Sequence, residues 1–444
     1  MKKINLKTMN KKAYAIVGLG GRHELFRNAI TDEFKNNCCL LALCDRNKGR
    51  LEKSQREAEE ISGYPVKGYH SDDFVQMIND LKPDCVIVTT MDSTHDDFIC
   101  RALDLGCDVI TEKPMTIDVQ KCRKILETQK KTGKRITVTF NYRYSPPRTQ
   151  VKDLLMAGTI GEIVTVDFNW LLDTYHGADY FRRWHRNKEN SGGLLVHKAT
   201  HHFDLVNWWI RSIPATVFAK GSRTFYTSKT AERMKLYNRA KRCHICEESE
   251  KCSFFLSLRD SPSLKSLYLD QEFHDGYYRD KCVFSSEIDI EDNMSVIVEY
   301  KNKIKLNYSL NAFSPWEGYI ISFNGTKGRI EHRMEETVYI NADGTVPGTM
   351  KKDKTRTTVY PLREQAHDVE IWEGEGGHGG ADPQMIRYIF DPDNQPFDKY
   401  QRSSDQRSGA WSIITGITAN RSMELNRPVE IDELIPDMEL PDFV

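Results

Sequence analysis

Residues 13–23 read Ala-Tyr-Ala-Ile-Val-Gly-Leu-Gly-Gly-Arg-His, an apolar run that ends in a glycine turn before a segment able to form a helix. A strand, a tight turn and a helix in this order are the context in which a glycine-rich fingerprint binds the pyrophosphate of a dinucleotide. We expect Gly18 and Gly20 to permit the turn, with Gly21 and Arg22 beside the phosphates. His23 departs from the pattern, because a small residue usually stands at that position.

A second apolar run, residues 38–44, ends at Asp45. An acid at this place in the fingerprint binds the hydroxyls of the adenosine ribose, although an acid in a loop can also cap the next helix. A carboxylate there repels a 2′-phosphate, so we expect NAD as the cofactor. Arg46 is able to bind that phosphate, which leaves NADP as the less favoured alternative.

Two further apolar runs, residues 85–90 and 108–110, alternate with segments of helical periodicity. This alternation predicts an α/β fold with a doubly wound parallel sheet. Ligands bind at the carboxyl edge of such a sheet, where four further candidates for cofactor binding lie: Thr90, His95, Glu112 and Lys113. With 444 residues, the chain is long enough for about two domains.

Further short motifs are Ser-Thr-His at residues 93–95, Glu-Lys-Pro at 112–114 and Asn-Tyr-Arg-Tyr at 141–144. Together with the glycine turn and Asp45, this order resembles the Gfo/Idh/MocA oxidoreductases, which act mostly on sugars and cyclitols with nicotinamide cofactors. The resemblance resumes at residues 158–163 and 191–204 and in the last helix near Ser422.

The resemblance implies a dinucleotide-binding Rossmann domain at residues 1–143 and an α+β domain at residues 144–444 with a large, mainly antiparallel sheet. Apolar and alternating runs at residues 163–168, 294–300 and 304–310 favour such a sheet. In the family this sheet also forms an oligomer interface, so we expect a homo-oligomer, a dimer or a tetramer. Residues 223–284 fall outside the resemblance and form an insertion.

In the family, the lysine of the Glu-Lys-Pro motif and a histidine of the second domain act at the substrate, which implies Lys113 and His201 here. Oxidising a secondary alcohol requires a hydride acceptor and a proton acceptor at the oxygen. His197 stands where the family usually has Asp or Asn, and Lys198 and His202 extend this set. If the segment is one helix, positions 197 and 201 share a face, which suits a proton relay, a divalent metal or a structural histidine cluster.

The sequence therefore predicts an NAD-dependent oxidoreductase that transfers a hydride to or from a secondary hydroxyl of a sugar, glycoside or cyclitol. Candidate substrate-binding residues are Lys113, Arg143, Trp184, Lys198, His202 and His378, with Tyr175, His176 and His185 left open. Pro114 follows a lysine that the family often holds in a tight turn, so its peptide bond is a candidate for the cis form.

Residues 374–382 contain five glycines and His378, and resemble a loop of family members that act on glycosides, including NAD-dependent glycosidases. Because glycine disfavours regular structure, we expect either an irregular loop close to a ligand or a flexible surface loop. This loop favours, as an alternative, a glycosidase or lyase that uses tightly bound NAD. A non-catalytic nucleotide-sensing protein is a third possibility, but it has no need of Lys113 and the histidines together.

The insertion gathers four of the eleven cysteines: Cys243, Cys246, Cys252 and Cys282. No signal peptide or membrane-spanning run is visible, so we expect a cytoplasmic protein, in which clustered cysteines bind metal more often than they form disulfides. Structural zinc, an iron–sulfur cluster and unligated thiols are the alternatives.

The insertion is also rich in aromatic and basic residues, a composition that can accompany nucleic-acid binding. The whole chain, however, has 63 basic and 64 acidic residues and lacks the basic footprint of a nucleic-acid-binding protein. We therefore expect these aromatics, Tyr277 and Tyr278 among them, to pack the insertion and line a sugar site. The expected partner is a small-molecule carbohydrate, with no nucleic acid and no membrane.

Overall fold

The structure is a computed structural model that describes residues 11–349, 355–374 and 377–444. Within these residues, one sheet has six parallel strands in the order β3-β2-β1-β4-β5-β6. Its strands are β1 (Lys12–Val17), β2 (Cys38–Asp45), β3 (Lys67–His70), β4 (Cys85–Val88), β5 (Asp108–Thr111) and β6 (Ile136–Val138). This strand order is that of the Rossmann fold, in which the ligand crevice lies where the order reverses, next to β1 and β4.

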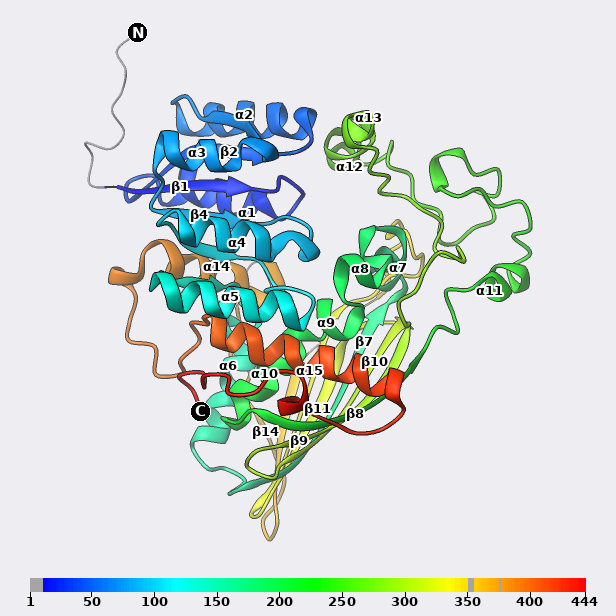
Figure 1. The fold of residues 1–444 in the computed structure, drawn as a ribbon. Coiled ribbons are helices and arrows are strands. Elements are labelled where there is room, and N and C mark those ends of the chain that lie inside the picture. Colours follow the sequence, from blue (N-terminus) through cyan, green and yellow to red (C-terminus); the bar gives the residue numbers. More distant parts are fainter. Residues whose placement is uncertain (1–10, 350–354, 375–376) are drawn as a thin grey trace.

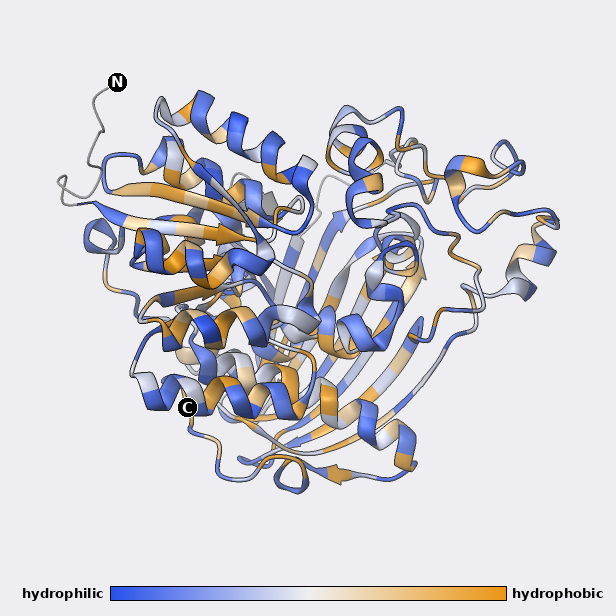
Figure 2. Cartoon of the chain, turned by 45° about the horizontal axis from the view of Figure 1, so that its top comes forward, coloured by the Kyte–Doolittle hydropathy of each residue, from blue (hydrophilic) through white to orange (hydrophobic). Residues whose placement is uncertain are grey.

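Helices cover both faces of this sheet: α1 (His23–Asn28), α2 (Lys48–Ser62), α3 (Phe74–Leu81), α4 (His95–Asp104) and α5 (Val119–Thr132). Local signals set their ends, since the side chain of Asn47 caps α2 and that of Asp118 caps α5. Both helices end at a glycine with positive φ. The central strands are buried and apolar, whereas the outer helix α2 is largely hydrophilic (Figure 2).

A second sheet has nine strands in the order β14-β13-β12-β11-β7-β10-β9-β8-β15 among the described residues. They are β7 (Ile163–Asp173), β8 (Pro214–Ser222), β9 (Asn293–Tyr300), β10 (Lys305–Ser314), β11 (Glu317–Gly325), β12 (Gly328–Thr337), β13 (Thr355–Pro361), β14 (His367–Val369) and β15 (Val429–Glu430). Among these described strands, only β7 and β10 pair in parallel. The predicted fold class is thus confirmed.

Burial alternates along β9 and β10, so one face of this sheet is covered and the other is open. The covering helices include α10 (Thr200–Ile210) and α15 (Gln406–Leu425), and α15 also contacts α5 of the first domain. The remaining helices between β6 and α10 are α6 (Pro146–Met156), α7 (Thr174–Arg182), α8 (Lys188–Ser191) and α9 (Leu194–His197). One apolar core is continuous through both domains, which fixes them against each other.

Near its C-terminal end the chain packs against the first sheet again, through α14 (Gly377–Phe390), which lies behind α4 in Figure 1. Met385, Ile386 and Phe390 are buried there, and the rings of Phe390 and Tyr14 lie 5.2 Å apart. The glycine-rich stretch predicted as a loop is therefore helical from Gly377, because packing against the sheet outweighs the low helix propensity of glycine. The side chain of His378 lies outside the described residues.

The insertion forms the long connection between β8 and β9, two neighbouring antiparallel strands. It contains three short helices: α11 (Ser228–Arg233), α12 (Pro262–Leu267) and α13 (Glu272–Asp275). In Figure 1, α12 and α13 lie opposite α2 of the first domain, while α11 lies far from it.

Candidate active site

A cavity of about 1000 Å³ lies at the carboxyl edge of the six-stranded sheet, between the two domains. The residues predicted to bind the cofactor all line it: Gly18, Gly20, Gly21, Arg22, Asp45, Arg46, Thr90, His95, Glu112 and Lys113. From the second domain, Trp184, His185, His197, Lys198 and His201 line the same cavity. The fold therefore brings both predicted sets together.

The glycine turn has the shape of a phosphate cradle. Gly18 has φ +89°, and a Cβ placed there would lie 2.6 Å from the backbone nitrogen of Thr90. At Gly20, by contrast, the nearest atom to such a Cβ is the hydroxyl of Tyr268 at 3.8 Å, an ordinary contact with the end of one side chain. Glycine is thus required at position 18 for close packing, while Gly20 and Gly21 face the cavity, where a dinucleotide fits.

Asp45 holds the end of β2 against this turn. Its carboxylate accepts hydrogen bonds from the backbone N–H groups of Leu19 and Asn47, each at 2.6 Å. It also lies 3.4 Å from Nη2 of Arg50. The carboxylate is fixed at the rim of the cavity, at the place expected for a ribose ligand.

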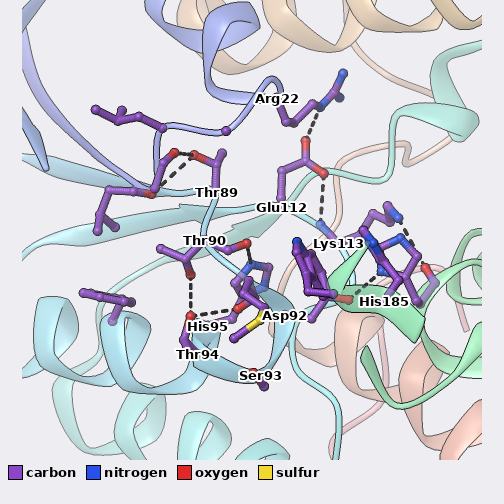
Figure 3. A pocket seen from close by; sticks show the side chains of 18 of the residues that line it. Arg22, Thr89, Thr90, Asp92, Ser93, Thr94, His95, Glu112, Lys113 and His185 are labelled. Atoms are coloured by element: carbon purple, nitrogen blue, oxygen red, sulfur yellow. Dashed lines mark hydrogen bonds and ion pairs between the residues drawn. The ribbon is translucent and has the colours of Figure 1, made fainter. Parts of the chain in front are cut away.

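The motif Glu112-Lys113-Pro114 is anchored by Arg22. Nε of Arg22 donates to Glu112 Oε1 at 2.6 Å, and Glu112 Oε2 accepts from the backbone N–H of Lys113 at 3.1 Å, as the dashed lines of Figure 3 show. Arg22 also pairs with Asp382 of α14 at 3.1 Å. The Lys113–Pro114 peptide bond, a candidate for the cis form in the sequence, is cis.

His95 supports the same turn from below. Its ring nitrogens lie 2.9 Å from the carbonyl oxygen of Pro114 and 3.1 Å from that of Thr90. His95 therefore joins the loops after β4 and β5, and its buried ring positions the cavity wall.

The side chain of Lys113 reaches across to the second domain. Its Nζ donates to the carbonyl oxygen of His197 at 3.2 Å. Burial lowers the pKa of Lys113 to about 8, against the opposing effect of the carboxylates of Asp92 and Glu112. The amine therefore exchanges its proton near neutral pH, as a general acid or base must.

His197 is held by Asp92, which follows β4 and was not among the predicted site residues. Nδ1 of His197 lies 2.5 Å from Asp92 Oδ2. Burial, together with the nearby cations Lys113 and Arg183, lowers the pKa of His197, while burial raises the pKa of Asp92. Both shifts favour a neutral pair that shares one proton.

His201 lines the cavity with its ring stacked on that of Tyr142, the centroids 4.1 Å apart. His197 ends α9 and His201 lies in α10, so the two do not belong to one continuous helix. Both side chains nevertheless line the same cavity, because only residues 198 and 199 separate α9 from α10.

Lys198 extends this wall of the cavity. Its Nζ donates to the Tyr142 hydroxyl at 3.2 Å and lies 3.7 Å from Glu317. Glu317 also binds Nδ1 of His176 at 2.7 Å. Trp184 stacks on His185 with 3.6 Å between centroids, and both line the cavity with His176, whereas Tyr175 does not.

Two residues predicted to bind substrate lie elsewhere. His202 is buried against Trp170, with 3.8 Å between ring centroids, and its Nδ1 binds the hydroxyl of Tyr308 at 2.7 Å. Arg143 forms a bidentate ion pair with Asp204 at 2.6 and 2.7 Å in the core. Neither lines the cavity, so the structure gives both a packing role instead.

The four cysteines of the insertion line one small second cavity of about 20 Å³: Cys243, Cys246, Cys252 and Cys282. They therefore converge, but no group of three or more His, Cys, Asp or Glu side chains in the described residues has an arrangement that could hold a metal ion. Burial raises the pKa of Cys252 to about 11, which keeps its thiol protonated. The structure does not support the predicted zinc or iron–sulfur cluster, nor a metal at the histidines.

Two family models match the chain, and their descriptions agree with this geometry. Residues 12–140 match the NAD-binding Rossmann fold of the GFO_IDH_MocA oxidoreductase family, and residues 152–431 match the C-terminal alpha/beta domain of the same family. The chain belongs to the Gfo/Idh/MocA oxidoreductase family. It is therefore an enzyme of the oxidoreductase class with a nicotinamide-dinucleotide site.

The chain is similar to one relative along nearly its whole length and to others over less than half of it. The protein YteT of Bacillus subtilis (strain 168), named as an oxidoreductase, is 35% identical over 431 residues, which cover 95% of this chain and 98% of YteT. An inositol 2-dehydrogenase of Salmonella typhimurium (strain LT2) is 29% identical over 205 residues, 46% of this chain and 55% of that enzyme. Among solved structures, the chain is similar to an oxidoreductase from Agrobacterium radiobacter, crystallised with NAD+, L-tartaric acid and magnesium. The TM-score is 0.60 at 15% sequence identity, and the match covers 96% of this chain and 100% of the other. This similarity shows a shared fold.

Several cavity residues of this Gfo/Idh/MocA chain were not predicted: Asp92, Asn141, Tyr142, Tyr180, Arg183 and Tyr268. Asp92 had a visible signal, because it follows an apolar strand as Lys113 does. Tyr268 had none, since it belongs to the insertion, whereas Tyr277 is one of the insertion aromatics expected to line the substrate site. In the part of the chain that the structure describes, no helix combines the length and apolar character needed to cross a membrane.

Proposed function

We propose that this enzyme transfers a hydride between NAD and a secondary hydroxyl of a sugar or cyclitol, with Lys113 and His201 handling the hydroxyl proton. One observation carries the proposal. The Lys113 amine, at the end of β5, binds the His197 carbonyl of the second domain, inside a cavity that His201 also lines. Lys113 of the first domain and His201 of the second domain therefore line the same cavity.

Bound NAD would supply the hydride acceptor, held by Gly18, Gly20 and Asp45. The chain supplies the proton chemistry. In the oxidation direction, the neutral amine of Lys113 accepts the hydroxyl proton, with His201 sharing the proton transfer at the same hydroxyl. The Asp92–His197 pair binds a neighbouring hydroxyl and keeps the substrate oriented. Trp184 and His185 provide a flat surface suited to the apolar face of a ring substrate.

The test is an activity screen with the full chain. Inositols and aldopyranosides are offered with NAD, and NADH is followed by absorbance. We expect turnover of at least one ring polyol, and a loss of roughly a hundredfold or more in Lys113→Ala and in His201→Ala with NAD affinity preserved. Near-normal turnover in both variants would contradict the assignment and favour a binding protein.

A second candidate function is a glycosidase or lyase that oxidises its substrate transiently with NAD kept in place. One observation favours this candidate. The insertion covers the glycine turn, because the hydroxyl of Tyr268 accepts a hydrogen bond from the backbone N–H of Gly21, and such a cover would help to retain NAD. Such an enzyme copurifies with stoichiometric NAD and releases an aglycone from a nitrophenyl glycoside without net NADH. A chain purified free of dinucleotide would contradict this candidate.

We also propose that the chain forms a homo-oligomer through the open face of its nine-stranded sheet. Ile297 and Ile320 lie at exposed positions on this open face, and exposed apolar side chains favour a surface that a partner covers. Light scattering should give the mass of a dimer or tetramer. A monomer at micromolar concentration would contradict it.

A further inference from the structure

The insertion reaches the cofactor domain at the first turn of α2. The Tyr268 hydroxyl accepts a hydrogen bond from the backbone N–H of Gly21 at 3.2 Å. Nδ2 of Asn47 donates to the carbonyl oxygen of Gln271 at 2.9 Å. A Cβ on Gly49 would lie 1.7 Å from Oε1 of Gln271, so the two segments pack with no gap. These contacts join residues more than 200 positions apart, and Figure 1 shows α12 and α13 facing α2.

Asp275, at the end of α13, meets the two arginines of this turn. Its Oδ2 lies 2.5 Å from Nη2 of Arg50 and 3.7 Å from Nε of Arg46. Only 4% of the Asp275 side chain is exposed, and only 9% of that of Arg50. Despite burial, the cation of Arg50 and the hydrogen bonds to the carboxylate lower the pKa of Asp275, so the group is charged at neutral pH.

These charges lie beside the part of the cavity that Asp45 marks for the adenosine ribose. Arg50 also contacts Asp45, at 3.4 Å, and Arg46 follows it in sequence. In NADP-binding Rossmann domains an arginine at this place receives the 2′-phosphate. Here both candidate arginines already pair with a carboxylate that comes from the insertion.

We propose that Asp275 is a determinant of cofactor selectivity, which acts with Asp45 to exclude NADP by occupying Arg46 and Arg50 and by repelling a 2′-phosphate. Selectivity then arises from a repulsive element as well as from an attractive one. The inference rests on the proposed binding of NAD at the glycine turn, and it adds a residue of the insertion to that site. Arg46 remains in place as a latent phosphate ligand, 59% exposed at its side chain.

The test measures the dissociation constants of NADH and NADPH for the full chain by fluorescence titration. Asp275→Asn keeps the shape of the side chain and removes its charge. We expect its affinity for NADPH to rise roughly tenfold while its affinity for NADH changes less than about threefold. Adding Arg46→Ala to this variant should remove most of the gain, because that arginine would bind the phosphate.

The matched control is Asp270→Asn in the same segment. Asp270 pairs with Lys265 at 2.8 Å on the surface, so its charge change should leave both affinities unaltered. An unchanged NADPH to NADH ratio in Asp275→Asn, with NADH still bound, would overturn this inference alone. If the unsubstituted chain bound neither dinucleotide, the proposed function itself would be wrong.

Discussion

Asp92 and His197 form a short hydrogen bond across the boundary of the two domains, with Oδ2 and Nδ1 2.5 Å apart. Asp92 follows β4 of the cofactor domain, and His197 ends α9 of the substrate domain. Lys113 binds the carbonyl oxygen of the same histidine. One residue of the second domain is therefore held by two residues of the first domain, which fixes this wall of the cavity.

Removing this hydrogen bond should impair catalysis more than cofactor binding. We expect Asp92→Ala to lower turnover about a hundredfold, because the imidazole loses the partner that orients it. NAD affinity, measured by titration, should change little. Asp104→Asn, a surface change at a residue that pairs with Lys131, serves as the control. Equal turnover in the two variants would show that the Asp92–His197 bond has no catalytic role.

The rate of oxidation should depend on the ionisation of Lys113. Its pKa of about 8 lies below the ordinary value because burial disfavours the cation. The amine accepts a proton only when neutral, so kcat/KM for oxidation should rise with pH through about 8 and then level off. In the reduction direction the rate should fall over the same range. The Lys113→Met variant should lose the rise of kcat/KM near pH 8. If the rise persisted in this variant, another group would have to cause it.

The ion pair between Arg143 and Asp204 should contribute to stability rather than to substrate binding. Both side chains are buried, and removing one leaves the other charge without compensation. Arg143→Met should therefore lower the free energy of unfolding by about 3–5 kcal/mol, measured by denaturant titration. The double variant Arg143→Met with Asp204→Leu should recover part of this loss. A change in substrate KM without a change in stability would restore the predicted binding role.

Asp45 should favour NAD over NADP, in addition to the role that we propose for Asp275. Asp45→Ala is expected to weaken NADH binding and to relax discrimination against NADPH, since it removes both a hydroxyl ligand and a repulsive charge. Because Asp45 and Asp275 both contact Arg50, the effects of Asp45→Ala and Asp275→Asn should not simply add. Binding constants for the two dinucleotides test this, and unaltered selectivity in Asp45→Ala would place the adenosine ribose elsewhere.

The parallel sheet and its ligand edge were predictable because they depend on local order along the chain. An apolar strand followed by Gly18, by Asp45 or by Lys113 places each residue at the carboxyl edge, whatever the rest of the chain does. These three residues line the cavity as expected.

The sequence could not predict the direction in which a side chain points, or the contacts between residues that lie far apart in the sequence. His201 and His202 are neighbours on one helix, so their side chains point about 100° apart, and only His201 faces the cavity. No local signal distinguishes the two imidazoles. Tyr268 and Asp275 reach the cofactor turn from the insertion, and such a contact follows from tertiary packing alone. The helix at Gly377 likewise depends on burial against the first sheet.

The most direct test of the proposed chemistry follows the hydride itself. The full chain is incubated with NAD and a panel of inositols and aldopyranosides that carry deuterium on the ring carbons, and the nicotinamide is then analysed by mass spectrometry. Net oxidation predicts deuterium on the nicotinamide of the NADH formed with at least one compound, and its loss in Lys113→Ala. A nicotinamide free of deuterium across the panel, in protein that binds NAD, would contradict net hydride transfer from a ring hydroxyl carbon to NAD.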